Sequence, residues 1–214
     1  MKREELDYLL YAVTDFSAYP HLDPVESCRL ALRGGASILQ LRQKNASTNE
    51  LVRLSEKLIP LCREHNACFI VNDDVEAALF SGADGVHIGQ HDTELSAARS
   101  RLGPDKIIGV SAQTVEQAVA ACRNGADYLG VGAVFPTSTK LDADSVNYDT
   151  LKAICAVSTV PVVAIGGINA SNICRLAGSG ISGISVVSAL FAAPDIEAMA
   201  KTLRSTASRT LFPA

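Results

Sequence analysis

The chain has 214 residues, of which 48% are hydrophobic and 20% charged, and its formal net charge is −4. These values are ordinary for a globular protein and exclude a disordered chain. The Lys and Arg residues are scattered, which is not typical of a nucleic-acid-binding surface. We therefore expect one domain over residues 1–214, with small-molecule partners and no nucleic acid; the oligomeric state stays open.

The first residues, MKREELDYLLYAVTD, contain one short apolar run that Asp15 interrupts. This run is too short for a signal-peptide core or a membrane span, so no membrane partner is expected. The six cysteines form no C-x-x-C pair and lie mostly in helix-like apolar patterns. Buried, reduced thiols in a cytoplasmic protein are the preferred interpretation, over disulfides or a metal cluster.

Eight short runs rich in Val and Ile predict β-strands. In chain order they are Leu9–Asp15, Ser37–Arg42, Cys68–Asp73, Gly85–Gly89, Lys106–Ser111, Tyr128–Val134, Pro161–Gly166 and Gly183–Ser188. Between them lie stretches with helical spacing, for example the leucines at 51, 54, 58 and 61. Near-continuous apolar strands that alternate with helices are typical of a parallel sheet covered by helices.

A weak internal repeat supports one particular α/β fold. The segments RGGASILQL, SGADGVHIG, NGADYLGVG and GSGISGISV all place a glycine before a strand, as expected for a left-handed helix cap. Eight strand-plus-helix units in about 200 residues match a compact (β/α)8 TIM barrel. A doubly wound open sheet is the alternative, but no G-x-G-x-x-G follows the first predicted strand.

The active site of such a barrel forms where the strands end, so the residues at those positions matter most. The second strand ends in QLRQK, where Gln40, Arg42 and Lys44 alternate with apolar or neutral residues. In an extended segment these three point to one side, toward the barrel axis. Two inward cations require an anion, although a frayed strand end with solvated charges would also fit.

Acidic residues follow the third and fourth strands. FIVNDD supplies Asp73 and Asp74, and Asp74 can cap the helix that follows. HIGQHD supplies Asp92, which can also be a cap. If Asp73 and Asp92 both face the axis, two carboxylates with phosphate oxygens are typical Mg²⁺ ligands. His87 is better explained as a satisfied interior histidine than as a base or ligand.

The remaining strand ends are rich in hydroxyls and glycine. Ser111 follows the fifth strand, before a helix that Thr114 opens. GAVFPTSTK follows the sixth, and its hydroxyls and lysine are either a phosphate site or only a polar loop. AIGGINAS and SVVSALF end the last two strands, and a Gly-Gly pair before a helix N-terminus can bind an anion through backbone N–H groups. The residues concerned are Thr137, Ser138, Thr139, Lys140, Gly166, Gly167, Val187 and Ser188.

The strand ends therefore predict two anion-binding regions on one rim. One contains Arg42, Lys44, Lys140 and a metal held by acids, and the other contains the Gly-Gly pair, the threonines and Ser188. A phosphate between the loops after the seventh and eighth strands is a recurrent feature of this fold. The residues alone support two phosphorylated groups in one site and do not name the molecules.

Over essentially the whole chain, the sequence resembles the thiamine-phosphate synthase family, also called thiamine-phosphate pyrophosphorylase. The matching segments are LYAVTD, GGASILQLRQK, FIVNDD, DGVHIGQHD, IIGVSAQT, GAVFPTSTK, VVAIGGI and ISVVSAL. The combination of QLRQK, VND, GQ-x-D and FPTSTK is the specific part of this resemblance.

The resemblance implies a transferase that joins hydroxymethylpyrimidine diphosphate to a thiazole phosphate, releasing pyrophosphate and requiring Mg²⁺. It assigns Asp73 and Asp92 to the metal, and Arg42, Lys44, Lys140 and Ser111 to catalysis. The pyrimidine diphosphate would contact Gln40, Leu41, Arg42, Gln43, Lys44, Asn72, Ser111 and Lys140. The thiazole phosphate would contact Thr137, Ser138, Thr139, Gly166, Gly167, Val187 and Ser188.

The family is thought to react through a pyrimidine carbocation, which needs no protein nucleophile, and the rim is expected to lack a Ser–His or Cys–His pair. Cations and Mg²⁺ would stabilise charge on the departing pyrophosphate. Two other functions stay open. A related thiazole tautomerase would not need the paired acids, and a thiamine-phosphate-binding protein would not need Lys140.

Overall fold

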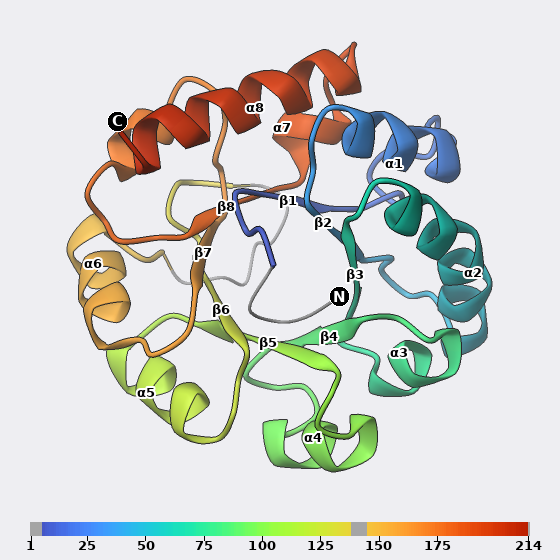
Figure 1. Ribbon diagram of the computed structural model, residues 1–214, viewed down its shortest axis with the longest axis horizontal. Coiled ribbons are helices and arrows are strands. Elements are labelled where there is room, and N and C mark those ends of the chain that lie inside the picture. Colours follow the sequence, from blue (N-terminus) through green and yellow to red (C-terminus); the bar gives the residue numbers. More distant parts are fainter. Residues whose placement is uncertain (1–5, 138–144, 214) are drawn as a thin grey trace.

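The computed structural model describes residues 6–137 and 145–213. Its eight strands are all parallel and close into a barrel in the order β1 to β8, inside a ring of helices (Figure 1). The predicted TIM barrel is therefore confirmed, and the open sheet is excluded. The strands are β1 Leu10–Val13, β2 Ile38–Leu41, β3 Cys68–Asn72, β4 Gly85–Ile88, β5 Ile107–Ala112, β6 Tyr128–Val131, β7 Val162–Ile165 and β8 Gly183–Val186.

All eight predicted strands are present, and most are shorter than the apolar runs that predicted them. The runs extend beyond the hydrogen-bonded ladder because residues past the strand ends remain partly buried; Val134, for example, packs against the core after β6 has ended. The apolar runs therefore predicted the position of each strand, but most strands end earlier, where the parallel hydrogen-bond ladder ends.

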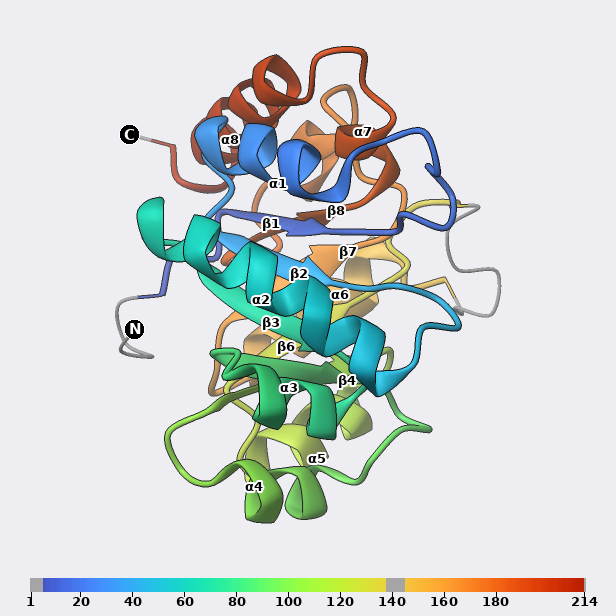
Figure 2. The same cartoon turned by 90° about the vertical axis from the view of Figure 1, so that its right-hand side faces the viewer.

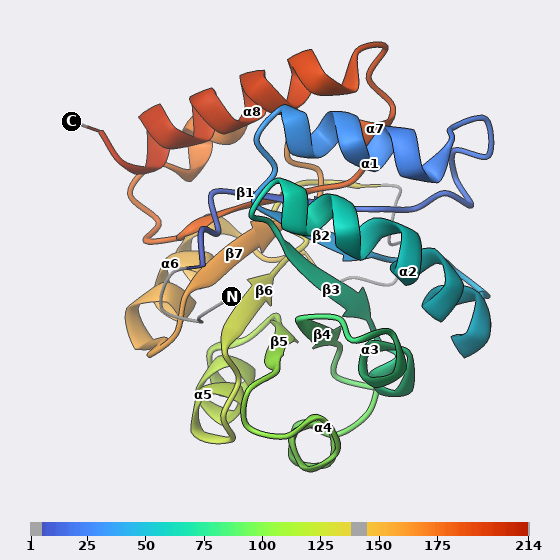
Figure 3. The ribbon, with the colours of Figure 1, turned by 45° about the vertical axis from the view of Figure 1, so that its right-hand side comes forward.

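Helices cover the outside of the barrel. They are α1 Pro24–Arg33, α2 Thr48–Glu64, α3 Val75–Ser81, α4 Leu95–Leu102, α5 Val115–Arg123, α6 Tyr148–Val157, α7 Ser188–Phe191 and α8 Ile196–Leu211, with a short 3-10 helix η2 Ile173–Leu176 between β7 and β8. The last helix, α8, packs beside α1 and closes the ring (Figure 3). Between β7 and β8, the short 3-10 helix η2 stands where the other strand connections have a longer α-helix.

Helix starts follow the expected chemistry. Ser47 and Glu50 form a reciprocal capping box at α2, and Thr114 caps α5 by accepting a hydrogen bond from Gln117 N. Helix ends use left-handed glycines, as at Gly82 (φ 73°) after α3 and Gly125 (φ 91°) after α5. The glycine repeat in the sequence thus marks the helix-to-strand turns that it predicted.

Two layers of buried side chains result from the alternation along each strand. Outward-facing residues such as Leu39 and Leu41 pack under the helices. Inward-facing residues fill the barrel, and here they include the buried tyrosines Tyr11 and Tyr128. A barrel interior is usually filled by branched aliphatic residues, so these polar rings are a departure from the pattern.

The six cysteines are free thiols. Cys28, Cys62 and Cys68 are buried, as expected, whereas Cys174 on η2 is exposed. Burial raises the pKa of all three buried thiols, so they remain protonated and unreactive. Among residues 6–137 and 145–213, no helix is both long and apolar enough to cross a membrane.

Candidate active site

The parallel barrel brings the ends of all eight strands to one rim. Seen from the side, the strands run in one direction through the shell of helices (Figure 2). Residues that follow β2, β3, β4, β5, β7 and β8 therefore share this rim although they lie far apart in the chain. Arg42, Asp73 and Gly167 are among them. Ser138, Thr139 and Lys140, three of the predicted site residues, lie outside the described residues.

Arg42 has an internal partner that the sequence analysis did not anticipate. Its Nη1 lies 2.8 Å from Oδ2 of Asp15, which follows β1 and is almost fully buried. Thr14 fixes the arginine backbone, because its Oγ1 accepts from Arg42 N at 2.9 Å and donates to Arg42 O at 3.0 Å. The anion that the inward cations require is thus supplied in part by the protein itself.

Asp15 could have been found by the same rule that located the other residues. It ends the first predicted strand, in the segment AVTD, where the rim was expected. Its Oδ1 is buried and has no hydrogen-bond partner among the described residues. An anionic oxygen left in this state is costly, so the Arg42 guanidinium is needed to hold the carboxylate in place.

The alternation of Gln40, Arg42 and Lys44 predicted that the extended strand would include Lys44, but it does not. β2 ends at Leu41, and Lys44 lies exposed in a turn in which Asn45 adopts a positive φ of 61°. The Leu41 side chain points into the layer beneath the helices, so only its backbone can face the rim. Gln43 donates from Nε2 to Ser17 Oγ at 3.3 Å. Gln40 and Arg42 are therefore the inward residues of this segment.

Asp73 and Asp74 have separate functions. Asp74 is the expected cap of α3, accepting from Ala77 N at 2.8 Å, and it also accepts from Thr48 Oγ1. Asp73 is exposed and adopts a positive φ of 62°, held by a hydrogen bond from its N–H to His87 O. Aspartate tolerates a left-handed backbone better than most residues other than glycine, and this conformation ends the extended strand at Asp73.

Asp92 is not a helix cap. The residue before α4 is Glu94, and Asp92 Oδ2 instead accepts from Gly89 N at 2.7 Å, which closes the turn after β4. Its other oxygen can bind a ligand. Within the described part of the chain, no group of three or more His, Cys, Asp or Glu side chains is arranged to hold a metal. A site made by Asp73 and Asp92 alone would need ligands from substrate and water.

His87 and Ser111 form a pair that the sequence analysis did not expect. His87 Nε2 lies 3.0 Å from Ser111 Oγ, and Nδ1 lies 2.9 Å from the Tyr128 hydroxyl. His87 is thus the satisfied interior histidine that was predicted, while the expected absence of a Ser–His pair was wrong. The second partner of the imidazole is a phenol rather than a carboxylate, so the arrangement is not that of a nucleophilic triad.

The loops after β6 and β7 meet through their backbones. Val134 N donates to Ile165 O, and Phe135 N donates to Gly166 O, both at 3.0 Å. A Cβ on Gly166 would lie 2.5 Å from Cβ of Ala133, and a Cβ on Gly167 would lie 2.4 Å from Pro136 O. The Gly-Gly pair is therefore required for this close approach, whatever else it binds.

The segments after β7 and β8 differ from the predicted helix N-terminus. Gly167 O accepts from Asn172 Nδ2 at 2.9 Å, and an Asn-stabilised turn precedes η2. Val187 leaves the strand, and Ser188 is the exposed first residue of the one-turn helix α7. Thr137 is partly buried at the end of the described part of the β6 loop.

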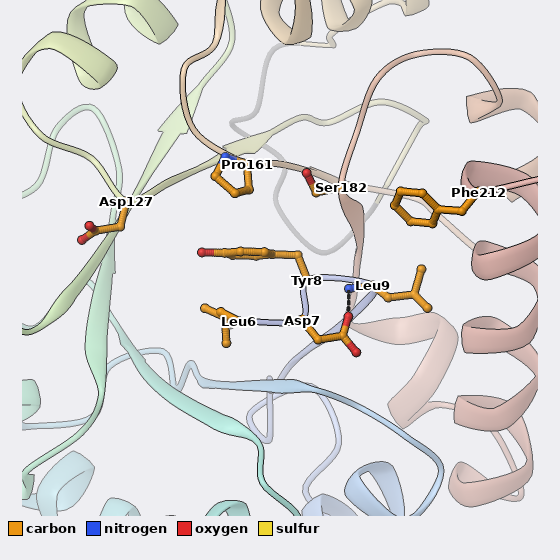
Figure 4. A pocket seen from close by; sticks show the side chains of 8 residues that line it. All are labelled: Leu6, Asp7, Tyr8, Leu9, Asp127, Pro161, Ser182 and Phe212. Carbon is orange, nitrogen blue, oxygen red and sulfur yellow. Dashed lines mark hydrogen bonds between the residues drawn. The ribbon is translucent and has the colours of Figure 1, made fainter. Parts of the chain in front are cut away.

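Two of the cavities in the described part of the chain bear on where a ligand could bind. The larger, about 650 Å³, is lined by residues around the strand starts, including Tyr8, Asp127 and Ser182 (Figure 4). This is the end opposite the rim, so we do not assign the active site to it. The smaller, about 550 Å³, lies between α3 and α4, and Asp73, Asp74 and Thr93 line it at the rim.

Sequence and structure comparisons agree on one family. The model of the thiamine monophosphate synthase family matches residues 10–190. The thiamine-phosphate synthase of Chlorobium phaeovibrioides is 47% identical over 196 residues, covering 91% of this chain and 92% of that protein. The thiamine phosphate pyrophosphorylase structure from Pyrococcus furiosus has a TM-score of 0.88 and 40% identity, and the match covers 96% of this chain and 98% of that one.

A plant relative is longer than this chain. The chloroplastic thiamine biosynthetic bifunctional enzyme of Arabidopsis thaliana is 44% identical over 205 residues. The match covers 94% of this chain but only 39% of that protein. The similarity therefore concerns one part of the plant enzyme, and it spans nearly the whole barrel described here.

Proposed function

Because the chain belongs to the thiamine monophosphate synthase family, we infer that it is a thiamine-phosphate synthase. It would transfer the pyrimidinylmethyl group of 4-amino-2-methyl-5-hydroxymethylpyrimidine diphosphate to the ring nitrogen of 4-methyl-5-(2-phosphooxyethyl)thiazole, or of its carboxylated form. The products would be thiamine phosphate and pyrophosphate. The six free cysteines support the proposal that the protein works in a reducing cytoplasm.

The observation that carries this proposal is the gathering of charged side chains and glycines at one end of the barrel. Arg42 follows β2, Asp73 follows β3 and Gly167 follows β7, so all three stand on the same rim. A reaction between two phosphorylated substrates needs two anion sites that face one cavity. In this proposal, chain segments far apart in sequence would supply both anion sites.

Arg42 is the cation best prepared for the diphosphate. Its ion pair with Asp15 and the backbone bonds to Thr14 limit its motion, so less freedom is lost when an anion binds. Breaking the carbon–oxygen bond concentrates charge on the leaving pyrophosphate, and a fixed guanidinium stabilises that charge as it develops. Lys44, exposed in its turn, and Lys140 would add further positive charge.

Asp73 and Asp92 fit a Mg²⁺ ion by their chemistry. Both are exposed carboxylates on neighbouring loops, and the turn of Asp92 is held by Gly89 while leaving one oxygen for a ligand. Hard carboxylate oxygens combined with substrate phosphate and water are the usual Mg²⁺ donor set. When bound, Mg²⁺ would neutralise charge on the diphosphate oxygens.

The second anion site would hold the thiazole phosphate. Gly166, Gly167, Val187 and Ser188 lie at the ends of β7 and β8, where phosphate sites recur in this fold. Thr137, Ser138 and Thr139 would add hydroxyl donors from the loop after β6. Holding the phosphate would orient the thiazole nitrogen toward the pyrimidine methylene carbon, which is the main requirement of a reaction without a protein nucleophile.

One assay tests the function. The purified protein is mixed with both phosphorylated substrates and Mg²⁺, and thiamine phosphate is measured as fluorescent thiochrome after oxidation, alongside released pyrophosphate. We expect equal amounts of the two products. Isomerisation of the thiazole without pyrophosphate release would instead identify a tautomerase, and binding of thiamine phosphate without turnover would identify a binding protein; either result overturns the proposal.

A further inference from the structure

A side-chain hydrogen bond joins the loop after β2 to the loop after β3. Thr48 is the first residue of α2, and its Oγ1 donates to Oδ2 of Asp74 at 2.7 Å. Asp74 stands at the start of α3, and α2 packs beside α3 on the outside of the barrel (Figure 1). The other carboxylate oxygen of Asp74 accepts from Ala77 N at 2.8 Å. Asp74 is therefore bound to both helices at once.

The residue before Asp74 has an unusual backbone conformation. Asp73 adopts a φ of 62°, and among the described residues only Asn45 and Asn66 share a positive φ without being glycine. Aspartate visits this region more readily than most residues, but the surrounding structure still has to select it over an extended backbone. Two contacts do so from opposite sides. Asp73 N donates to His87 O at 2.8 Å, and the Thr48 hydroxyl fixes Asp74.

A further side of this turn borders open space. The cavity of about 550 Å³ between α3 and α4 is lined by Asp73, Asp74 and Thr93. A close-packed interior resists movement, whereas a turn beside a cavity has room to shift into it. The position of the Asp73 carboxylate therefore depends on the contact that Asp74 makes with α2.

We propose that Thr48 is a positioning residue that holds the Asp73 carboxylate in the place where it binds Mg²⁺ together with the diphosphate. This rests on the function proposed above, in which Asp73 and Asp92 are the metal ligands. Thr48 touches neither the metal nor the substrate and acts through Asp74. Mg²⁺ demands near-ideal geometry from its ligands, so a site with only two protein carboxylates is sensitive to the displacement of either one.

The size of the effect follows from populations. When a site is in its binding conformation for only part of the time, its apparent affinity falls by that fraction. Without the Thr48 hydroxyl, the turn loses one ordinary hydrogen bond that favours the binding conformation. The affinity for the metal should then fall about fivefold.

The test measures metal binding without turnover. Thr48→Val removes the hydroxyl and nearly keeps the shape of the side chain. Binding of pyrophosphate to the purified protein is measured by calorimetry, once with excess Mg²⁺ and once with EDTA in place of the metal. The ratio of the two dissociation constants is the gain in affinity that Mg²⁺ provides. Thr48→Val should reduce this gain about fivefold and leave pyrophosphate binding without metal within about twofold of the wild type.

Three further variants show whether the effect passes through Asp74 to Asp73. Thr48→Ser restores the hydroxyl and should restore the gain. Asp74→Asn should keep the gain, since its amide nitrogen can donate to the Thr48 hydroxyl while its oxygen caps α3. Asp73→Asn should lose most of the gain, and adding Thr48→Val to it should cause no further loss, because both changes act on the same ligand.

Thr202→Val is the matched control. Thr202 lies on α8, which contributes no residue to the proposed site, and its hydroxyl donates to Ala198 O at 2.9 Å within that helix. The same chemical change at this position should leave the Mg²⁺ gain unchanged. Thermal unfolding of each variant checks that the protein is folded. In steady-state kinetics, Thr48→Val should raise the Mg²⁺ concentration for half-maximal rate and leave KM for the thiazole phosphate unchanged.

An unchanged Mg²⁺ gain in Thr48→Val overturns the proposal, and so does an equal loss of pyrophosphate affinity with and without the metal. Failure of Thr48→Ser to restore the gain, or a further loss in the double variant with Asp73→Asn, would show that Thr48 acts in another way. These outcomes are distinct from failure of the proposed function. If the wild type forms no thiamine phosphate, the function is wrong. If it does so and the Mg²⁺ gain does not depend on Thr48, only this inference is wrong.

Discussion

The two sides of the rim are built differently. After β2 to β5, the proposed site consists of side chains with individual hydrogen-bond partners, such as Arg42 with Asp15 and Ser111 with His87. After β6 and β7, it consists of backbone segments in direct contact, with glycines where a Cβ would collide. Chemistry on the first side can change while the fold stays intact. On the second side, the site and the fold depend on the same atoms.

We expect the largest loss of activity on the side of the rim after β2 to β5, here called the side-chain half. Asp73→Asn removes the carboxylate while keeping a residue type that tolerates the positive φ of 62°. We expect kcat to fall about 100-fold and the Mg²⁺ concentration for half-maximal rate to rise, with little change in melting temperature. Steady-state rates across a Mg²⁺ titration measure this.

The neighbouring acid provides the control for Asp73. Asp74 caps α3 through Ala77 N, and asparagine caps a helix about as well as aspartate. Asp74→Asn should therefore leave both the rate and the Mg²⁺ dependence nearly unchanged. If Asp73→Asn keeps the wild-type Mg²⁺ dependence, Asp73 is not a metal ligand, and the side-chain half loses its distinguishing chemistry.

Substitutions on the side after β6 and β7, here called the backbone half, should lower both activity and stability. Gly166→Ala places a Cβ 2.5 Å from that of Ala133 at a φ of 100°, so we expect at least about 2 kcal/mol of destabilisation together with a higher KM for the thiazole phosphate. Gly82→Ala is the control, because its φ is also positive, at 73°, but no atom lies within 4 Å of the added Cβ. Gly82→Ala should lower the free energy of unfolding by about 1 kcal/mol and leave KM for the thiazole phosphate unchanged.

Denaturant unfolding and kinetics on the same preparations separate these effects. If Gly166→Ala raises KM without a loss of stability beyond that of Gly82→Ala, the loops after β6 and β7 can part without affecting the fold. The contrast between the two halves of the rim would then be wrong.

The same contrast explains what the sequence could and could not predict. Short apolar runs rich in Val and Ile identified the eight strands that the structure describes, and the strand-end rule placed Arg42 and Asp73 just after β2 and β3, because these depend on local pattern and chain order. Asp15 also ends a predicted strand, but its ion pair with Arg42, 27 residues away, cannot be predicted from the strand end alone. Gly166 and Gly167 were predicted to bind an anion, and their packing against the loop after β6 was missed because a glycine that approaches a ligand and one that approaches another loop look alike in sequence.

Other misses were geometric. The alternation in QLRQK predicted an inward Lys44, but the ladder ends at Leu41, and a turn at Asn45 directs the chain elsewhere. The hydrogen bonds that link Tyr11, Tyr128 and His87 inside the barrel were also not predicted, since each of these looks like an ordinary strand residue in sequence. Only the closure of the barrel brings their side chains together, and a closed barrel was predicted without the register that pairs them.

The ion pair after β1 and β2 should show an asymmetry. Arg42→Ala leaves the Asp15 carboxylate buried and unpaired, which should cost about 3 kcal/mol, whereas Asp15→Asn removes the buried charge and should cost about 1 kcal/mol. The double variant with both residues changed to alanine should lose less stability than the two single alanine variants together. Equal and additive losses would mean that the pair is solvated and does not position Arg42.

The smallest expected effect concerns Lys44. Its side chain is exposed in a turn beyond the end of β2, whereas Arg42 is held by its ion pair with Asp15. Lys44→Ala should lower kcat/KM for the pyrimidine diphosphate by about threefold to tenfold and leave stability unchanged, since an exposed charge contributes little to folding. The loss should shrink at high salt, because solvent ions screen an exposed cation more than a buried one. Kinetics at two ionic strengths check this. A loss as large as that of Asp73→Asn, independent of salt, would place the Lys44 ammonium inside the closed site with substrate bound, and the turn at Asn45 would then have to rearrange.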